Sequence, residues 1–281
     1  MLVFTEKKAL RKHLEPQQKQ GFSIGFVPTM GALHQGHLSL LKHSLKDNQI
    51  TIISIFVNPT QFNNTEDLEK YPRTLDSDIK KIETLNKQII IFSPTVEDIY
   101  EGKIVSKNFN FDGLENQMEG KHRPGHFDGV GTIVKKLFEI VQPNKAYFGQ
   151  KDFQQLQIVK KMVSKHKIPI EIIGCPIHRE ENGLAMSSRN QRLSENARNK
   201  ASIIYSTLKK AKTIFETKSA ILTQKFVETE FQKHPEFTLE YFEIADEKTL
   251  LTCKRKSKKK QYRAFIAVFI EDIRLIDNLS L

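Results

Sequence analysis

The sequence has only two cysteines among its 281 residues, Cys175 and Cys253, which lie far apart and form no CxxC pair. This scarcity argues against a disulfide framework and against a cysteine-based zinc site. Apolar runs long enough to span a bilayer are also missing, so no membrane partner is expected. The N-terminal segment places apolar residues before basic ones and lacks a small-residue cleavage site, unlike a secretory signal. We therefore expect a cytoplasmic protein.

The formal net charge of +11 raises the possibility of nucleic-acid binding. Six of the basic residues, however, lie in the heptapeptide KRKSKKK at 254–260, between two strand-like segments. The run contains no aromatic residues that could stack on bases. It is therefore interpreted as the solvated tip of a hairpin, and no nucleic-acid partner is predicted. A nucleic-acid-binding protein that uses this run stays as the alternative from a different functional class.

Five continuous apolar runs, separated by segments with helical spacing, organise the first 175 residues. Runs of Val, Ile and Phe without alternation are typical of parallel strands covered by helices on both faces. The fold class predicted is therefore α/β, a Rossmann-like doubly wound parallel sheet. The expected strands are 22–27, 50–57, 88–93, 145–149 and 168–174, and the expected helices are 37–47, 75–87, 127–141 and 153–166.

The pattern changes after Pro176. Segments 194–215 and 219–234 have helical spacing, Ser194 is a plausible N-cap, and the strand-like segments 238–245 and 262–270 flank the lysine run. We expect a smaller α+β C-terminal domain at 177–281 that closes over a domain at 1–176. No internal repeat or long linker separates the two, so a cleft between them is the expected ligand site.

The segment PTMGALHQGH at 28–37 follows the first expected buried strand. Ligands of open α/β sheets bind where strands turn into helices. Gly31 and Gly36 would allow close approach of a ligand, and the N-terminus of the next helix suits a phosphate. His34 and His37 could then donate hydrogen bonds to phosphoryl oxygens. The alternative is a pair of structural histidines, and a zinc site is weaker because no third ligand is nearby.

Two further segments offer groups that suit phosphates. FGQKDFQQL at 148–156 places Lys151 and Asp152 after the fourth expected strand, although a lone Lys-Asp pair is more often a surface ion pair. GLAMSSRNQRLS at 183–194 offers Ser187, Ser188 and Arg189 in one loop, residue types that are common in any loop. Their significance comes from being combined at one edge of the sheet.

Two glutamines follow strand ends near these segments. Gln61 lies in FVNPTQF and Gln155 in FQQL, and their amides suit the hydroxyl and carboxylate groups of a small polar substrate. Isolated glutamines are usually solvated, so the assignment depends on their place beside the phosphate candidates.

Taken together, these motifs closely resemble the pantoate–β-alanine ligase family from end to end. The resemblance rests on PTMGALHQGH, FVNPTQF, YPRT, RPGHFDGV, FGQKDFQQL, GLAMSSRN and RLIDN, in this order. The family is part of the HxGH nucleotidyltransferase-like superfamily, and MSSR would play the part of the KMSKS loop in class I aminoacyl-tRNA synthetases. The resemblance implies a homodimer and Mg²⁺ bound through ATP phosphates.

The resemblance also implies the reaction: ATP and (R)-pantoate form pantoyl adenylate and diphosphate, and β-alanine then displaces AMP to give pantothenate. It implies catalytic roles for His37, His34 and Lys151, and binding of pantoate and β-alanine by Gln61 and Gln155. No residue of the protein is assigned as a metal ligand, and Asp78 is not assigned as one either. The ATP site would comprise Met30, Gly31, Ala32, Leu33, His34, Gln35, Gly36, His37, Gly149, Gln150, Lys151, Asp152, His178, Met186, Ser187, Ser188 and Arg189.

Three features depart from the family pattern. His178 stands where a small aliphatic side chain near the adenine is expected, and Ser77 stands where some relatives carry a carboxylate. The basic run at 254–260 is also unusual. A nucleotidyltransferase that moves AMP or CMP onto a phosphate-bearing acceptor is the alternative enzyme. It would share the histidine turn but would not need Gln61 and Gln155.

Overall fold

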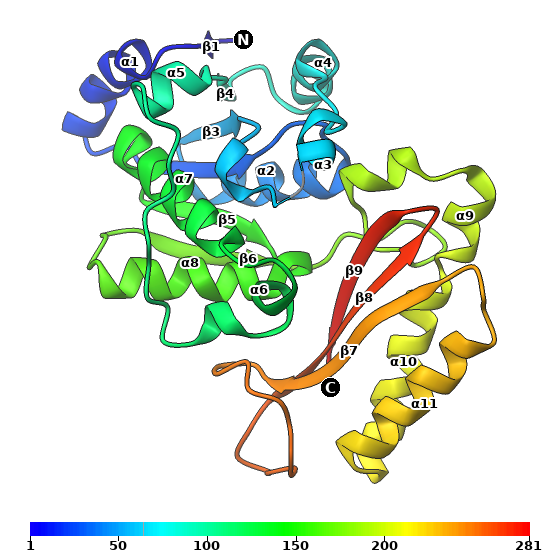
Figure 1. Ribbon diagram of the computed structural model, residues 1–281. Coiled ribbons are helices and arrows are strands. Elements are labelled where there is room, and N and C mark those ends of the chain that lie inside the picture. Colours follow the sequence, from blue (N-terminus) through cyan, green and yellow to red (C-terminus); the bar gives the residue numbers. More distant parts are fainter. Residues whose placement is uncertain (64) are drawn as a thin grey trace.

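The computed structural model describes residues 1–63 and 65–281 and contains two sheets in two adjoining units (Figure 1). The larger sheet is six-stranded and parallel, with the order β1-β4-β3-β2-β5-β6. This arrangement confirms the predicted doubly wound α/β class. Its strands are β1 (Val3–Phe4), β2 (Ile24–Thr29), β3 (Ile50–Ile55), β4 (Ile90–Phe92), β5 (Lys145–Gly149) and β6 (Glu171–Cys175).

Helices cover both faces of this sheet. One face packs on α1, α7 and α8 through residues such as Phe26 and Phe148, and the other packs on α2 and α4 through Val27 and Tyr147. Burial on both faces explains why the strands are continuously apolar. The helices of this unit are α1 (Lys7–Lys19), α2 (Gln35–Asp47), α3 (Thr65–Glu69), α4 (Leu75–Leu85), α5 (Val96–Tyr100), α6 (Met118–His122), α7 (His126–Val141) and α8 (Phe153–Lys165).

The order of strands reverses between β2 and β5. From β2 the chain proceeds to β3 and β4 on one side, whereas β5 and β6 extend the sheet on the other side. Such a switch point leaves a crevice at the carboxyl ends of the two central strands. The histidine turn follows β2 and the lysine turn follows β5, so the topology places both at this crevice.

The second unit is an antiparallel sheet of β7 (Thr238–Asp246), β8 (Tyr262–Ile270) and β9 (Ile273–Ser280). The helices α9 (Glu195–Lys200), α10 (Ile203–Thr217) and α11 (Ala220–Gln232) belong to this unit, and α10 and α11 contribute to its core. The hydroxyl of Ser194 accepts from the amide of Ala197, which confirms the predicted N-cap. The two units touch, since the rings of Phe153 and Phe265 lie 5.9 Å apart. The exact boundary at residue 176 stays a prediction.

Two expectations for this C-terminal part were wrong. The continuous helix expected at 194–215 is broken near Ser202, whose hydroxyl donates to the carbonyl of Asn199. The predicted pair of strands is a three-stranded sheet, because β9 pairs with β8 along its whole length. Buried polar residues in β9, Asp277 and Asn278, interrupt the apolar pattern that identified the other strands.

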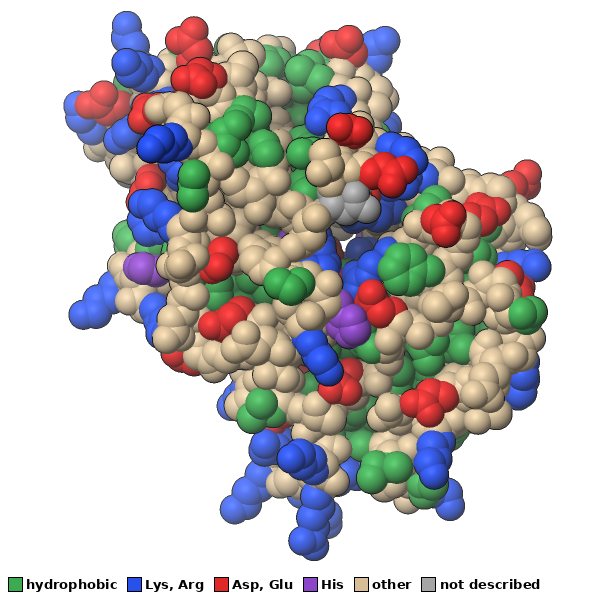
Figure 2. Space-filling view, viewed as in Figure 1, with side chains coloured by type: hydrophobic (Ala, Val, Ile, Leu, Met, Phe, Trp, Pro, Cys, Tyr) green, Lys and Arg blue, Asp and Glu red, His purple; other side chains and the backbone are tan. Residues whose placement is uncertain are grey.

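The basic run at 254–260 is the exposed connection between β7 and β8, as predicted. Its lysines and arginine form the blue cluster at the lower tip of the molecule (Figure 2). Among the helices of the described residues, none combines the length and apolarity that crossing a bilayer requires.

Candidate active site

The histidine turn after β2 is held by a buried carboxylate. Gly31 and Ala32 have φ values of +84° and +50°, and a side chain at Gly31 would also crowd Ile55. Asp78, which is fully buried, accepts hydrogen bonds from the amides of Ala32 at 2.9 Å and Leu33 at 2.8 Å. Asp78 therefore positions the turn.

Replacing Asp78 with alanine is expected to lower the free energy of unfolding by at least about 2 kcal/mol, because two buried amides would lose their acceptor. Urea unfolding followed by circular dichroism measures this change. Asp76 lies exposed in the first turn of the same helix, so Asp76→Ala is the matched control and should cost less than about 1 kcal/mol. Equal losses in the two variants would contradict the positioning role of Asp78.

The two histidines cap the N-terminus of α2 with their own rings. Nδ1 of His34 accepts from the amide of Gly36 at 3.1 Å, and Nδ1 of His37 accepts from the amide of His34 at 3.3 Å. The ring centroids are 4.0 Å apart. Because Nδ1 is an acceptor in both rings, the neutral imidazoles carry their proton on Nε2. Each histidine can therefore donate from Nε2 to an anion.

Burial keeps both imidazoles uncharged. It lowers the pKa of His34 to about 2, with further contributions from His37 and Lys151. Burial and the cations Lys151 and Lys81 lower the pKa of His37 to about 4. At neutral pH the two rings therefore act as hydrogen-bond donors, and Lys151 supplies the positive charge beside them.

The lysine turn after β5 is supported by the C-terminal sheet. The side-chain amide of Asn278 donates to the carbonyls of Gln150 at 2.9 Å and Lys151 at 2.8 Å. Arg263 in turn donates to Oδ1 of Asn278 at 2.6 Å. Nζ of Lys151 lies 3.7 Å from Oδ1 of Asp152, too far for a dedicated hydrogen bond. The lysine is thus held by its backbone and can use its ammonium group for a ligand.

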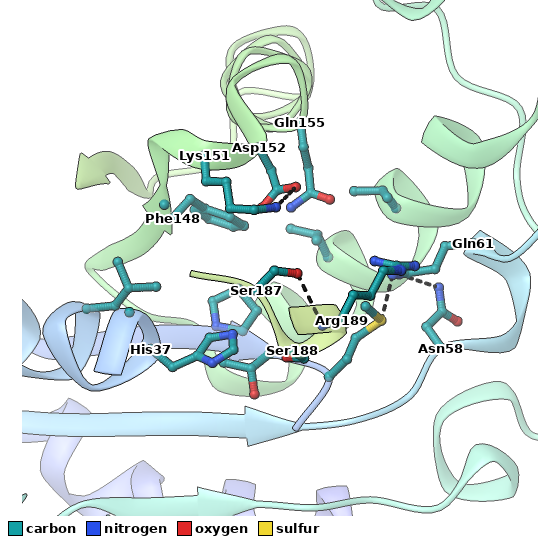
Figure 3. Close-up of a pocket in the computed structure, with 18 of the residues that line it drawn as sticks. His37, Asn58, Gln61, Phe148, Lys151, Asp152, Gln155, Ser187, Ser188 and Arg189 are labelled. Atoms are coloured by element: carbon teal, nitrogen blue, oxygen red, sulfur yellow. Dashed lines mark hydrogen bonds and ion pairs between the residues drawn. The ribbon is translucent and has the colours of Figure 1, made fainter. Parts of the chain in front are cut away.

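The serine loop at 186–189 contacts the histidine turn directly. The hydroxyl of Ser188 donates to the carbonyl of Ala32 at 3.0 Å, and the hydroxyl of Ser187 accepts from the amide of Arg189 at 3.3 Å. The guanidinium of Arg189 is paired with Asp67 at 2.7 Å. The Ser188 contact links the chain after β6 to the turn after β2. Figure 3 shows Ser187, Ser188 and Arg189 beside His37, with the bond between Ser187 and Arg189 dashed.

Gln61 lies across the site from His37 in the view of Figure 3. It ends the short 3₁₀ helix Pro59–Gln61, which packs so closely on α7 that a Cβ at Gly129 would lie 2.2 Å from the carbonyl oxygen of Thr60. The side chain of Gln61 accepts from Asn58 at 3.2 Å, and its Nε2 lies 2.8 Å from Sδ of Met30. Gln155 lies on α8, on the same side of the cavity as Lys151 in Figure 3.

These segments enclose a cavity of about 230 Å³ that most of the predicted site residues line. Those that line it are Met30, His34, Gly36, His37, Gln61, Gly149, Lys151, Asp152, Gln155, His178, Met186, Ser187, Ser188 and Arg189. Among the described residues, five predicted members of the ATP site are outside the lining: Gly31, Ala32, Leu33, Gln35 and Gln150. The structure therefore brings the three motifs together, and the role of each residue stays a prediction.

The lining also includes residues that sequence reasoning did not assign, among them Asn58, Phe62, Tyr71, Arg123 and His126. They lie in FVNPTQF, YPRT and RPGHFDGV, motifs that contributed only to the resemblance. The rings of Phe62 and Tyr71 meet edge to face at 5.7 Å. Position within these motifs was the available signal, and Asn58 also follows the end of β3 more closely than His34 follows the end of β2.

The site contains few candidate metal ligands. Across residues 1–63 and 65–281, no group of three His, Cys, Asp or Glu residues could hold an ion. Asp152 is the only carboxylate among the described residues that line the cavity. Mg²⁺ takes oxygen ligands and usually binds through one or two carboxylates and substrate phosphates. The cavity therefore fits a cation that arrives with phosphates and accepts at most one carboxylate from the protein.

Comparison with known proteins gives a consistent result along the whole chain. The family model described as pantoate-beta-alanine ligase matches residues 2–280. The pantothenate synthetase of Flavobacterium psychrophilum is 65% identical over 281 residues, which are 100% of both chains. That of Christiangramia forsetii is 55% identical and covers 100% of this chain and 99% of its own.

Solved structures agree with the sequence relatives. The crystal structure of pantothenate synthetase from Thermus thermophilus is 38% identical, covers 99% of each chain and gives a TM-score of 0.91. A pantoate-beta-alanine ligase from Francisella tularensis, complexed with beta-gamma ATP and beta-alanine, is 35% identical. It covers 100% of this chain and 97% of its own, with a TM-score of 0.81.

Proposed function

The chain belongs to the pantoate-beta-alanine ligase family, and from this premise we infer that it is an ATP-dependent ligase that condenses (R)-pantoate with β-alanine to give pantothenate. The ligands of the Francisella tularensis relative support ATP and β-alanine as substrates. The single observation that carries the inference for this chain is the shared cavity, in which the histidine turn, the lysine turn and the serine loop meet.

In the first step, a carboxylate oxygen of pantoate attacks the α-phosphorus of ATP. An oxygen–phosphorus bond forms, the bond to the β-phosphate oxygen breaks, and diphosphate leaves. Negative charge moves toward the leaving phosphates, so Nε2–H of His34 and His37 and the ammonium of Lys151 would stabilise the transition state. Ser187, Ser188 and Arg189 would hold the phosphates from the other side.

In the second step, the unprotonated amine of β-alanine attacks the acyl carbon of pantoyl adenylate. The carbon–nitrogen bond forms, the bond to the AMP oxygen breaks, and the amine loses its proton to water. AMP is a good leaving group, so the protein mainly has to position the two reactants and exclude water. Gln61 and Gln155 would hold pantoate through its hydroxyl and carbonyl groups.

Mg²⁺ would enter as part of the substrate MgATP. It would be bound by the phosphates, and Asp152, the carboxylate in the described lining, would hold it or one of its waters. The homodimer and the cytoplasmic location that the sequence predicts are further parts of this proposal. Sedimentation of the purified protein at several concentrations tests the dimer.

The direct test supplies the protein with ATP, Mg²⁺, D-pantoate and β-alanine. We expect AMP, diphosphate and pantothenate in equal amounts by mass spectrometry. A reaction that releases diphosphate without any need for pantoate would instead favour the nucleotidyltransferase alternative.

Gln61→Ala is expected to weaken pantoate binding by about tenfold, because one or two hydrogen bonds to the substrate would be lost. Isothermal titration with pantoate in the presence of a nonhydrolysable ATP analogue measures the effect. The ATP affinity of the variant is the internal control and should stay within about twofold. An unchanged dissociation constant for pantoate would count against the role of Gln61.

A further inference from the structure

Arg123 is a largely buried cation at the wall of the cavity. It follows α6 directly, and 23% of its side chain is exposed. It lines the main cavity and also a side cavity of about 30 Å³ that reaches toward the C-terminal sheet. His126 and Gln155 line both cavities as well. The guanidinium therefore lines the same cavity as Gln61 and Gln155 and is available to a ligand there.

Glu119, the acid nearest to Arg123, already accepts hydrogen bonds from other residues. Glu119 accepts from both terminal nitrogens of Arg274, at 2.8 and 2.7 Å, and from the hydroxyl of Tyr241 at 2.7 Å. Its distance to Arg123 is 3.8 Å, too long for a hydrogen bond. A buried cation normally needs a close, hydrogen-bonded anion, and Glu119 does not provide one.

The two other partners of Arg123 are neutral acceptors that fix its direction. Its terminal nitrogens lie 3.2 Å from Nε2 of His126 and 3.4 Å from the carbonyl oxygen of Gln61. Nδ1 of His126 donates to the same carbonyl at 2.8 Å, which leaves Nε2 as the acceptor. Burial, and next Arg123, lower the pKa of His126 to about 4, so the ring stays neutral. Of the five donors of the guanidinium, these contacts use two.

The ligation needs an anchor of this kind. β-Alanine carries its carboxylate two methylene groups away from the amine that attacks, whereas the carboxylate of pantoate is consumed at the α-phosphate. Resting on the function proposed above, we propose that Arg123, held by His126 and the backbone of Gln61, binds the carboxylate of β-alanine and selects amines that carry an acid group. The side chain and the backbone of Gln61 would then serve adjoining substrates, which couples the two subsites.

Arg123→Met tests this subsite, because methionine keeps most of the apolar packing and removes the charge. We expect the KM for β-alanine to rise by roughly ten- to a hundredfold, the loss of a charge-assisted bidentate pair. Pantoate-dependent exchange of labelled diphosphate into ATP should stay within about twofold of wild type, since β-alanine takes no part in it. Trapping of the adenylate by hydroxylamine, which has no carboxylate, should also be unchanged.

A comparison of two amines gives the sharpest readout. Wild type should prefer β-alanine to β-alaninamide, and Arg123→Met should lose most of that preference, while Arg123→Lys should retain part of it. Lys121→Met, which removes an exposed charge from α6, the helix just before Arg123, is the matched control and should leave every parameter unchanged.

Three results would overturn the assignment: an unchanged KM for β-alanine, an equal loss with β-alanine and hydroxylamine, or a rise in the KM for pantoate instead. Failure of wild type to exchange diphosphate in a pantoate-dependent way would refute the proposed function rather than this subsite.

Discussion

Lys151→Ala is expected to slow adenylate formation by about a hundred- to a thousandfold, the effect of removing a preorganised group that stabilises charge in the transition state. The ammonium lies in the cavity beside two imidazoles that are neutral at pH 7, so it adds a positive charge that they cannot supply. Pantoate-dependent exchange of labelled diphosphate into ATP measures the step without interference from β-alanine. Pantoate binding should weaken far less, because the stabilised charge develops only during reaction.

His37→Ala should show the same pattern with a smaller loss of rate. Lys145→Ala is the matched control, since Lys145 begins the same strand at its opposite end and pairs loosely with Glu171 at 3.9 Å. Its exchange rate should equal that of wild type. Equal losses of rate and of pantoate affinity in Lys151→Ala would contradict the assignment to the transition state.

Arg274→Met is expected to lower the free energy of unfolding by about 3–5 kcal/mol, because it leaves the carboxylate of Glu119 buried without its partner. Arg274 on β9 binds Glu119 next to the cavity and also Glu240 on β7, at 2.5 Å through one terminal nitrogen. The pair therefore joins the C-terminal sheet to α6. Denaturant unfolding measures the loss, and adding Glu119→Gln should restore part of it.

The same cluster predicts how stability depends on pH. Burial alone would raise the pKa of Glu119, but the hydrogen bonds and charge of Arg274 outweigh burial and hold it at about 2. A depressed pKa stabilises the fold above the ordinary value of 4.5, and this contribution is lost as pH falls toward 2. Arg274→Met should flatten this part of the profile, whereas Lys210→Met, which breaks an exposed pair with Glu230, should leave it unchanged. If the stability of Arg274→Met fell with decreasing pH in the same way as that of wild type, this account of the cluster would be contradicted.

Most of the sheet could be predicted because both of its faces are buried, which makes its strands continuously apolar. β1 gives no such signal, since its two residues pair at an edge with Ile91 and Phe92. β9 was missed because Asp277 and Asn278 are buried polar residues whose partners, such as Arg179 and Arg263, are distant in sequence. A local pattern cannot show that such residues will be satisfied in the fold.

The same distinction applies to the candidate site. The histidine and lysine turns were found because each follows a buried strand at the switch point of the sheet. The residues that support these turns were not found from the sequence. Asp78 binds a turn 46 positions away, and Asn278 binds one 127 positions away. Arg123 can be identified as a candidate binding residue only once the hydrogen bonds between Arg274 and Glu119 are known.

The most direct test of the central claim is a crystal structure with a nonhydrolysable analogue of pantoyl adenylate. We expect the group that replaces the phosphate within about 3 Å of Nζ of Lys151 and of an imidazole Nε2 from the histidine turn, the ordinary length of a hydrogen bond. The pantoyl group should lie between Gln61 and Gln155. Density for the analogue outside the cavity, or a phosphate mimic turned away from both the histidines and the lysine, would contradict the account.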